Sequence, residues 1–365
     1  NAVAGLAQAE RAVTDISNTN WQMRLDPAAT WQNDELFAPP VNNLPKLPVN
    51  PPTGGWGMLN SKNAKVVHLP ATVEEYDWGY NGNKFGSGGN YLGVSWFSTK
   101  INVPAQLKGK RVVLNFESVR FRAEIFVNHK LVGYDLVNST PFDVDITNAV
   151  KPGRNELDVR ITDPNGNFDW RDSQNFMWGD YRTQPTHGFG GITGKVKLTV
   201  TDKVFVSDVF VKNKPKVNEV DVQVTGNNEL KNEVSGQYRL QVRDAKTKLL
   251  VFDKKVAARL APGSNAQVIT VAVNNAKLWD IDHPNLYTIN VKWNGANGTA
   301  DEVSKRFGFR WFEIKNVNGD PQFYLNNKRI VLRTSISWGF WAVNGIAPSD
   351  ALARNWWAIL VRGVV

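Results

Sequence analysis

The chain has 365 residues, of which 42% are hydrophobic and 21% charged, and this length exceeds what one hydrophobic core usually organises. Its formal net charge of +9 comes from Lys and Arg spread along the whole chain with Asp and Glu between them, which argues against nucleic-acid binding. The absence of cysteine excludes disulfides, thiol catalysis and zinc sites built from thiolates.

No apolar run approaches the roughly 18 residues that a membrane helix needs, so we expect a soluble protein without a membrane span. The chain begins at Asn1 and lacks an initiator methionine. This start agrees with a removed export signal and predicts a periplasmic or secreted protein, although a boundary chosen in cloning would look the same.

The first 75 residues are rich in Pro, Asn and Trp, and the stretch 39–52 holds too many prolines for a helix or a central strand. We therefore predict that residues 1–75 form an irregular N-terminal arm packed on the first domain.

From about Tyr91 the hydrophobic residues recur with a period of two, which is typical of half-buried strands. Turn sequences lie at 151–153 and 163–166, and no helical periodicity separates the strands. The pattern predicts an antiparallel sandwich, most simply a jelly roll, over residues 76–202. The residues expected to share its core faces are Val112, Leu114, Phe116, Ala123, Ile125, Val127, Leu157, Val159, Ile161, Val196, Leu198 and Val200.

A second series of about seven alternating segments fills residues 203–314. Seven short strands in about 110 residues are typical of an immunoglobulin-like β-sandwich. The chain lacks the cysteines of an antibody domain, so only the architecture is implied.

The pattern changes again after Trp311. Two apolar segments, 323–325 and 329–332, flank a tight turn, and Ser349 could cap the helical run that follows it. A strand, a loop and a helix in this order predict the start of an α/β unit in residues 315–365, and one such unit cannot bury both of its faces alone.

Two acidic pairs allow alternative interpretations. Asp143 and Asp145 share a face of a predicted strand, which would suit acid/base chemistry or calcium, but we favour an ordinary strand-end pattern. Glu74 and Glu75 are interpreted as a solvated pair. The four histidines have no ligand spacing, so neither a metal site nor a cofactor is predicted.

Several segments, taken in order, resemble the non-catalytic front end of glycoside hydrolase family 2, which contains β-galactosidases, β-glucuronidases and β-mannosidases. The shared order spans about three quarters of the chain and is hard to obtain by chance. The matching segments are 95–97, 103–104, 123–128, 141–147, 187–196, 278–279, 284–287, 306–310 and 324–333.

The resemblance implies an all-β fold class: a jelly-roll β-sandwich and an immunoglobulin-like β-sandwich, followed by the first strand and helix of a truncated (β/α)8 barrel. Two positions depart from the family pattern. Members usually have Asn-Gly at the hairpin where this chain has Asn128-His129, and a His on the first barrel strand where it has Trp338. These departures lead us to expect a divergent branch with an altered substrate.

Retaining glycoside hydrolysis uses two carboxyl groups about 5 Å apart, one as nucleophile and the other as acid and then base. The resemblance places both, as glutamates, on later barrel strands beyond residue 365. Because no Glu follows Glu313, no catalytic residue is predicted in this chain, and we expect the chain alone to be inactive.

Sugar recognition combines aromatic faces with directional polar groups. By resemblance, an Asn-x-x-Gly loop and the loop 178–182 lean from the first sandwich toward the substrate, and tryptophans end the first barrel strand. For each position, packing is the alternative to binding. The predicted substrate-binding residues are Asn90, Asp180, Arg182, Trp338 and Trp341.

Three functions stay open. The first is the N-terminal portion of a β-galactosidase-like glycosidase acting on β-linked glycans, whose partner is the missing catalytic barrel of its own polypeptide. The second is a carbohydrate-binding or scaffolding module without turnover. The third is a purely structural role, bracing a homo-oligomer, which would predict no sugar binding.

Overall fold

The computed structural model describes most of the chain, and nearly all the regular structure in the described part is β. No helix in that part is long and apolar enough to cross a membrane. The described residues are 11–29, 44, 49–60, 63–77, 91, 93–137, 139–163, 177–178, 181–182, 190–332 and 354–355.

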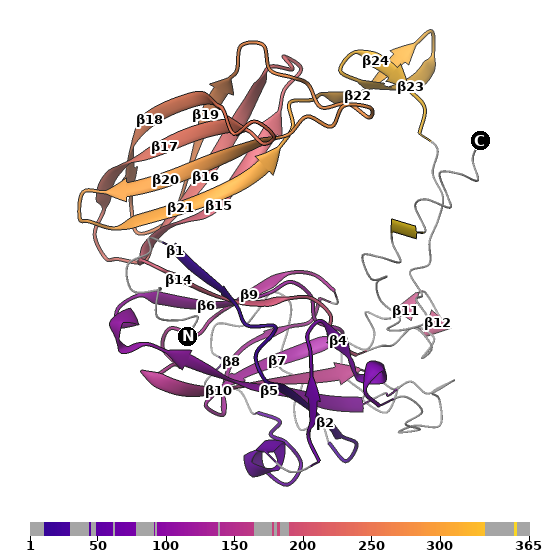
Figure 1. The fold of residues 1–365 in the computed structure, drawn as a ribbon, viewed down its shortest axis with the longest axis vertical. Helices are drawn as coiled ribbons and strands as arrows, with labels where there is room; N and C mark the ends of the chain where they lie inside the picture. The colour runs from indigo at the N-terminus through magenta and orange to yellow at the C-terminus, as the bar shows by residue number, and fades with distance from the viewer. Residues whose placement is uncertain are drawn as a thin grey trace.

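The first half of the molecule contains two antiparallel sheets that face one another across a core (Figure 1). The four-stranded sheet has the order β1 (Arg11–Asp15), β14 (Val196–Thr201), β6 (Arg111–Phe116) and β9 (Phe142–Asp145). The six-stranded sheet has the order β3 (Lys65–Val67), β2 (Trp21–Asp26), β5 (Gly93–Val103), β10 (Gly153–Asp163), β7 (Arg122–Val127) and β8 (Lys130–Asp135).

The alternation in the sequence places the predicted residues in this core. All twelve side chains expected to face inward are buried in one hydrophobic cluster, together with Trp21 of β2 and Phe97 of β5. Each large aliphatic or aromatic side chain buried in this way contributes roughly 1.5–3 kcal/mol of hydrophobic stabilisation. The opposite face of the same strands is thereby left for polar groups and for covering segments.

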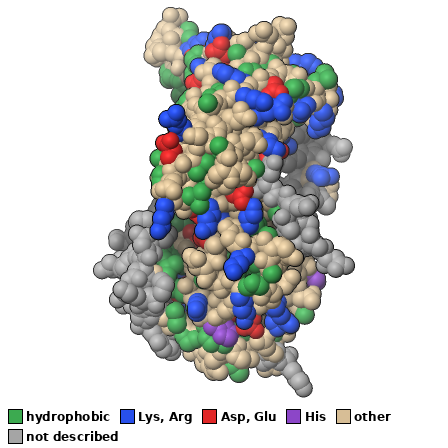
Figure 2. Space-filling model, turned by 90° about the vertical axis from the view of Figure 1, so that its left-hand side faces the viewer, with side chains coloured by type: hydrophobic (Ala, Val, Ile, Leu, Met, Phe, Trp, Pro, Cys, Tyr) green, Lys and Arg blue, Asp and Glu red, His purple; other side chains and the backbone are tan. Residues whose placement is uncertain are grey.

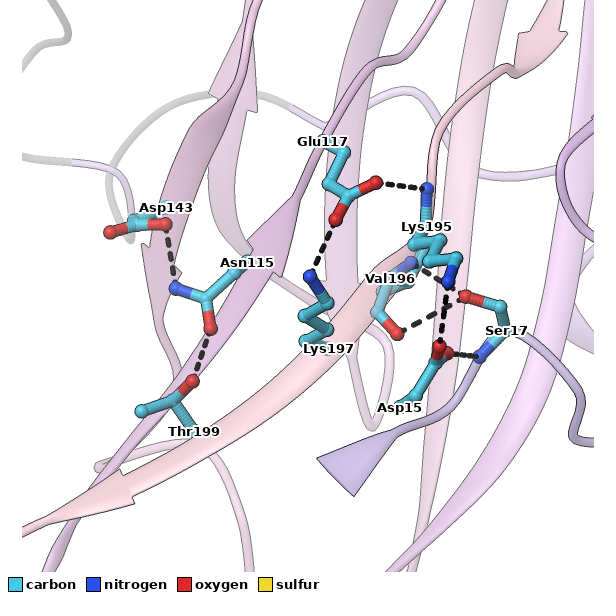
Figure 3. A network of polar contacts seen from close by, with 9 residues as sticks. All are labelled: Asp15, Ser17, Asn115, Glu117, Asp143, Lys195, Val196, Lys197 and Thr199. Atoms are coloured by element: carbon cyan, nitrogen blue, oxygen red, sulfur yellow. Dashed lines mark hydrogen bonds and ion pairs between the residues drawn. The ribbon is translucent and has the colours of Figure 1, made fainter. Parts of the chain in front are cut away.

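The outer face of the four-stranded sheet carries a network of polar contacts (Figure 3). The Asn115 amide donates to Asp143 at 2.7 Å, and Lys197 pairs with Glu117 at 2.5 Å. The Ser17 hydroxyl accepts the Val196 backbone N–H at 2.9 Å, which fastens the end of β1 onto β14. Asp143 is thus tied to its neighbouring strand β6 through Asn115.

Residues 11–26 differ from the irregular arm expected for residues 1–75. They form β1 and β2, which pair antiparallel with β14 and β5 and belong to the two sheets. Two further short strands of this region are β3 and β4 (Ala71–Thr72), which pair antiparallel with β2 and with β13 (Gly191–Ile192). The alternation in β1 and β2 is too short to stand out from the surrounding Pro- and Asn-rich sequence.

The second half is a sandwich of seven strands around its own core, which includes Tyr238, Trp293 and Phe309. This number of strands agrees with the prediction for residues 203–314. Its three-stranded sheet has the order β15 (Val204–Asn213), β16 (Glu219–Asn228) and β19 (Gly263–Ala272). Its four-stranded sheet has the order β18 (Leu250–Leu260), β17 (Val234–Asp244), β20 (Tyr287–Gly295) and β21 (Ala300–Phe307).

The junction between the two sandwiches is held by charged side chains, with β1 lying beside it (Figure 1). The Arg11 guanidinium donates two hydrogen bonds to Asp301, at 2.9 and 2.7 Å, and a third to the Val206 carbonyl at 2.7 Å. Lys110 pairs with Asp202, whose second oxygen accepts a backbone N–H from β21. The strand that opens the first sandwich therefore also locks the second one in place.

A small antiparallel sheet projects beyond the second sandwich (Figure 1). It contains β22 (Phe312–Val317), β23 (Asp320–Leu325) and β24 (Lys328–Ile330). Asn326 and Asn327 have φ values of 50° and 64°, which confirms the predicted tight turn. The predicted barrel strand and the Ser349 cap lie outside the described residues, and of the predicted helix only residues 354–355 are described, both of them helical.

Positive charge is distributed over both sandwiches on the face drawn in Figure 2, with acidic side chains between the Lys and Arg side chains. This distribution matches the interleaved pattern of charge in the sequence.

Candidate functional site

The predicted site residues fall mostly outside the part of the chain that the structure describes. Asn90, Asp180, Trp338 and Trp341 lie outside it, and Arg182 is described only by its backbone. That backbone belongs to β12 (Tyr181–Arg182), which pairs with β11 (Met177–Trp178) so that Met177 lies opposite Arg182. The five side chains therefore stay predictions, but the described residues show where their segments are anchored.

Two buried carboxyl groups and a half-buried arginine lie together where these segments leave the first sandwich. The residues are Glu74 in the short 3-10 helix η4 (Val73–Glu75), Arg120 ahead of β7, and Asp163 at the end of β10. We call these three residues the buried charge cluster. The Glu74 residue is only 2% exposed. The interpretation of Glu74 and Glu75 as a solvated pair is therefore wrong for Glu74.

Local structure explains why one glutamate of the pair turns inward. The Glu75 carboxylate accepts the Thr72 backbone N–H at 2.9 Å, which completes a capping box at the start of η4. Its neighbour Glu74 then points to the opposite side and into the protein. One of its oxygens accepts the backbone N–H of Tyr91 at 3.0 Å.

The backbone beside the cluster is closely packed. Arg120 and Gly191 exchange two hydrogen bonds, at 2.6 and 2.8 Å, and the Val73 N–H donates to the Gly190 carbonyl at 2.8 Å. A Cβ atom on Gly191 would lie 2.2 Å from the Ala71 carbonyl oxygen, so only glycine fits there. Gly190 and Gly191 therefore serve close backbone packing at this point of the sandwich.

The same geometry brings both ends of the segment 164–189 to one place. Asp163 precedes this segment and Gly190 follows it, and a Cβ atom on Gly190 would lie 3.3 Å from the Asp163 Cβ. Asn90 adjoins Tyr91, whose N–H bonds to Glu74. The chain positions that carry Asn90, Asp180 and Arg182 thus all depart from the buried charge cluster.

Burial gives the cluster unusual electrostatics. It raises the pKa of Glu74 to about 7 against the attraction of Arg120, and it raises the pKa of Asp163 well above its ordinary value, with the Glu74 charge adding to the effect. Burial also lowers the pKa of Arg120, while the two carboxylates oppose that change. Within the described residues, Glu74 Oε2 and Asp163 Oδ2 have no hydrogen-bond partner. A carboxyl group that retains its proton near neutral pH can donate a hydrogen bond.

Sequence reasoning missed all three members of the cluster. Asp163 was read only as the first residue of a turn, and nothing in the sequence around Arg120 indicates burial. Lys, Glu, Arg and Asp side chains are almost never fully buried unless they are paired. From the sequence alone, each of the three residues was therefore expected to be exposed to solvent.

The first prediction concerns Glu74. The pKa of Glu74 is raised in the folded chain, so folding is favoured while this carboxyl group is protonated. Its contribution to the free energy of unfolding is fully present below the unfolded pKa near 4.5 and is lost as the pH rises through about 7. A Glu74→Gln variant keeps the acceptor for Tyr91 and carries no charge. We expect it to gain stability relative to the native chain at pH 8, on the order of 2 kcal/mol, and to match it at pH 4.

Urea unfolding measured from pH 4 to pH 8 checks this expectation. Glu75→Gln is the matched control, because it changes the neighbouring carboxylate at the capping box and should show no such gain as the pH rises. An equal offset between the native chain and Glu74→Gln at every pH would contradict a buried, titrating Glu74.

Comparison with known protein families gives two matches that follow one another along the chain. The model for the sugar binding domain of glycosyl hydrolases family 2 matches residues 85–201, and the model for glycosyl hydrolases family 2 matches residues 204–310. The two matched regions correspond to the two sandwiches and together cover more than half of the chain.

Curated relatives show the same similarity. A putative beta-glucuronidase from Formosa agariphila is 29% identical over 280 residues, covering 75% of this chain and 31% of the relative. A beta-galactosidase from Thermoanaerobacter pseudethanolicus is 27% identical over 277 residues, covering 75% of this chain and 35% of the relative. The chain thus spans about a third of the length of these relatives.

Solved structures share the fold. A putative beta-galactosidase from Bacteroides fragilis superposes with a TM-score of 0.71 at 23% identity, covering 96% of this chain and 48% of that protein. A Bacteroides uniformis beta-glucuronidase superposes with a TM-score of 0.68 at 20% identity, covering 96% of this chain and 38% of that protein.

Proposed function

The chain belongs to glycosyl hydrolase family 2, and from this membership we propose that it is the N-terminal portion of an enzyme that hydrolyses O-glycosidic bonds of β-linked sugars. The observation that carries the proposal is the ordered match of both sandwiches to the family. The relatives named as glycosidases are about three times as long as the matched region.

The proposed reaction proceeds with retention through two glutamates, both outside this chain. The contribution of the chain is then to bind and orient the sugar. The buried charge cluster supports this role, because it fixes the points from which the segments carrying Asn90, Asp180 and Arg182 depart. We further propose that residues 315–365 open a (β/α)8 barrel, with Trp338 and Trp341 at the substrate, and that the first sandwich is a jelly roll.

The choice of sugar stays open between the two classes that the relatives' names give, glucuronides and galactosides. The β-galactosidase-like activity expected from the sequence is therefore one of two specific proposals. A panel of aryl β-glycosides that includes β-galactoside, β-glucuronide and β-mannoside discriminates them.

The decisive experiment compares the 365-residue chain with the product of the coding sequence extended past Val365. We expect the extended protein to hydrolyse at least one aryl β-glycoside, and the 365-residue chain to release no more aglycone than a blank. Replacing either glutamate of the pair with glutamine should abolish turnover by the extended protein. An extended protein that shows no turnover, or that keeps it after both replacements, would refute the enzyme proposal.

Export is a separate proposal. A periplasmic or secreted location predicts a cleavable signal ahead of Asn1 in the full coding sequence. Fractionation of cells that express this coding sequence, followed by N-terminal sequencing of the exported protein, checks it.

A further inference from the structure

The outer face of the six-stranded sheet contains a cavity of about 500 Å³. This volume lies in the range of small-molecule sites in proteins. The floor is formed by outward-facing side chains of β2, β5 and β10, and the walls by the short helix η3 (Trp56–Asn60) and the turn between β7 and β8. The cavity therefore lies on the side of the sheet opposite to the main hydrophobic core, next to a smaller hydrophobic cluster that includes Trp96 and Phe126.

Polar side chains in register line the floor. Gln22 and Asp158 lie on either side of Ser98, and in a neighbouring row Lys100 lies directly opposite Glu156. These rows place amide, hydroxyl, carboxylate and ammonium groups at the spacing of adjacent strands, about 4.8 Å. Donors and acceptors alternate across a width comparable to that of a pyranose ring.

One carboxyl group of the floor, that of Asp158, is buried with few polar partners to offset its loss of hydration. Asp158 is 5% exposed, and burial raises the pKa of its carboxyl group to about 6 against the opposing effect of the nearby Ser98 hydroxyl. No hydrogen bond of ordinary geometry joins the two, and the buried Ser98 hydroxyl has no partner among the described residues. Both residues line the cavity.

The wall supplies a flat aromatic surface. The His129 imidazole stacks on the Trp56 indole with ring centroids 4.5 Å apart and planes at 12°, and both rings line the cavity. Edge-on contacts from Trp96 and Phe126 hold the indole in place. His129 also pairs with Glu156 at 2.9 Å.

The position of His129 is itself unusual. Asn128 and His129 have φ values of 49° and 66°, as in a type I′ hairpin turn, where Gly is favoured at the second position. A non-glycine residue in this conformation costs free energy that glycine avoids. The contacts of the His129 side chain explain why a histidine occupies this position. Its imidazole completes the aromatic wall with Trp56 and orients Glu156.

We propose that this cavity binds a neutral pyranose unit of a β-linked oligosaccharide. The aromatic wall fits the apolar C–H face of such a ring, and the floor fits its hydroxyl groups. A neutral ligand is favoured because the Glu156 carboxylate is already paired with His129 and faces Lys100. The binding does not depend on hydrolysis, and the inference goes beyond the proposed enzymatic function.

The test is calorimetric titration of the 365-residue chain with cellobiose and with lactose, and with methyl β-glucuronide as an anionic comparator. We expect a neutral disaccharide to bind. His129→Gly, which suits the turn and should fold, and Asp158→Asn, which removes only the charge, should each weaken binding by about tenfold or more. Asp143→Asn, on the exposed face of the other sheet, is the matched control and should leave binding unchanged.

Three results would overturn the inference: no binding of either neutral sugar, binding that the two cavity variants leave unchanged, or binding of the glucuronide alone. Unfolding midpoints of all variants are measured in parallel, and a His129→Gly midpoint at or above the native value shows that its loss of binding is local. An extended protein that hydrolyses glycosides while the chain fails this titration would refute the cavity site and leave the proposed enzyme intact.

Discussion

Replacing Asp301 with alanine should lower the free energy of unfolding of the second sandwich by about 3–5 kcal/mol, the cost of leaving one partner of a buried ion pair uncompensated. The Asp301 residue is 0% exposed and accepts two hydrogen bonds from Arg11 and one from the Val206 backbone N–H at 2.7 Å. The alanine variant leaves the buried Val206 N–H without an acceptor and removes both bonds from the Arg11 guanidinium, which is itself 24% exposed. Chemical denaturation followed by tryptophan fluorescence measures the change.

The second sandwich also provides a matched control. Asp253 on β18 accepts the same bidentate pattern from Arg239, at 2.9 and 2.6 Å, but both side chains are solvent-accessible. Exposed ion pairs contribute little to stability, so Asp253→Ala should leave the unfolding midpoint unchanged within error. Equal losses in the two variants would show that burial is not the source of the Asp301 effect.

A double-mutant cycle extends this argument to the junction between the sandwiches. Because Arg11 and Asp301 act as one unit, Arg11→Ala combined with Asp301→Ala should cost clearly less than the sum of the single changes. Additive costs would mean that β1 does not couple the two sandwiches through this pair.

The sequence predicted the strands whose alternation is long and regular. Leu157, Val159 and Ile161 occupy one face of an 11-residue strand, and their period of two is enough to assign both the strand and its buried face. The second sandwich and the Asn326–Asn327 hairpin were predicted for the same reason, because pattern and turn chemistry are local properties of the chain.

Pairings between distant segments were out of reach of that reasoning. Arg11 lies opposite Thr201 in the sheet, and its carboxylate partner Asp301 belongs to the other sandwich. A five-residue strand such as β1 obtains its stability from tertiary contacts that local propensity does not encode. Its Pro- and Asn-rich surroundings therefore favoured the incorrect expectation of an irregular arm.

The candidate site shows the same limit more strongly. Its predicted residues came from the family resemblance, whereas the buried charge cluster became visible only in the three-dimensional arrangement. Burial of Glu74 follows from the capping box that engages Glu75 and from the N–H of Tyr91, seventeen positions along the chain. No residue-by-residue property distinguishes the inward glutamate from its neighbour.

The second large effect is expected at Glu124, whose carboxylate pairs with Arg160 at 2.6 Å between directly opposed positions of β7 and β10. The two side chains are 2% and 1% exposed. Glu124→Ala removes the carboxylate and leaves the guanidinium buried in the sheet, so the free energy of unfolding of the first sandwich should fall by about 3–5 kcal/mol. Urea titration of the variant against the native chain measures this loss.

Two further variants show whether the loss of stability comes from leaving a charge buried without its partner or simply from the loss of a side-chain contact. Glu117→Ala removes a carboxylate that pairs with Lys197 at 2.5 Å on the exposed face of the other sheet, and it should change stability by less than about 1 kcal/mol. Apolar replacement of both buried partners, Glu124→Leu with Arg160→Met, should recover much of the single-variant loss, because neither charge is then left without its counterpart in the sheet. If this double variant is as unstable as Glu124→Ala, the stability of the six-stranded sheet depends on the ion pair itself, and the desolvation argument fails.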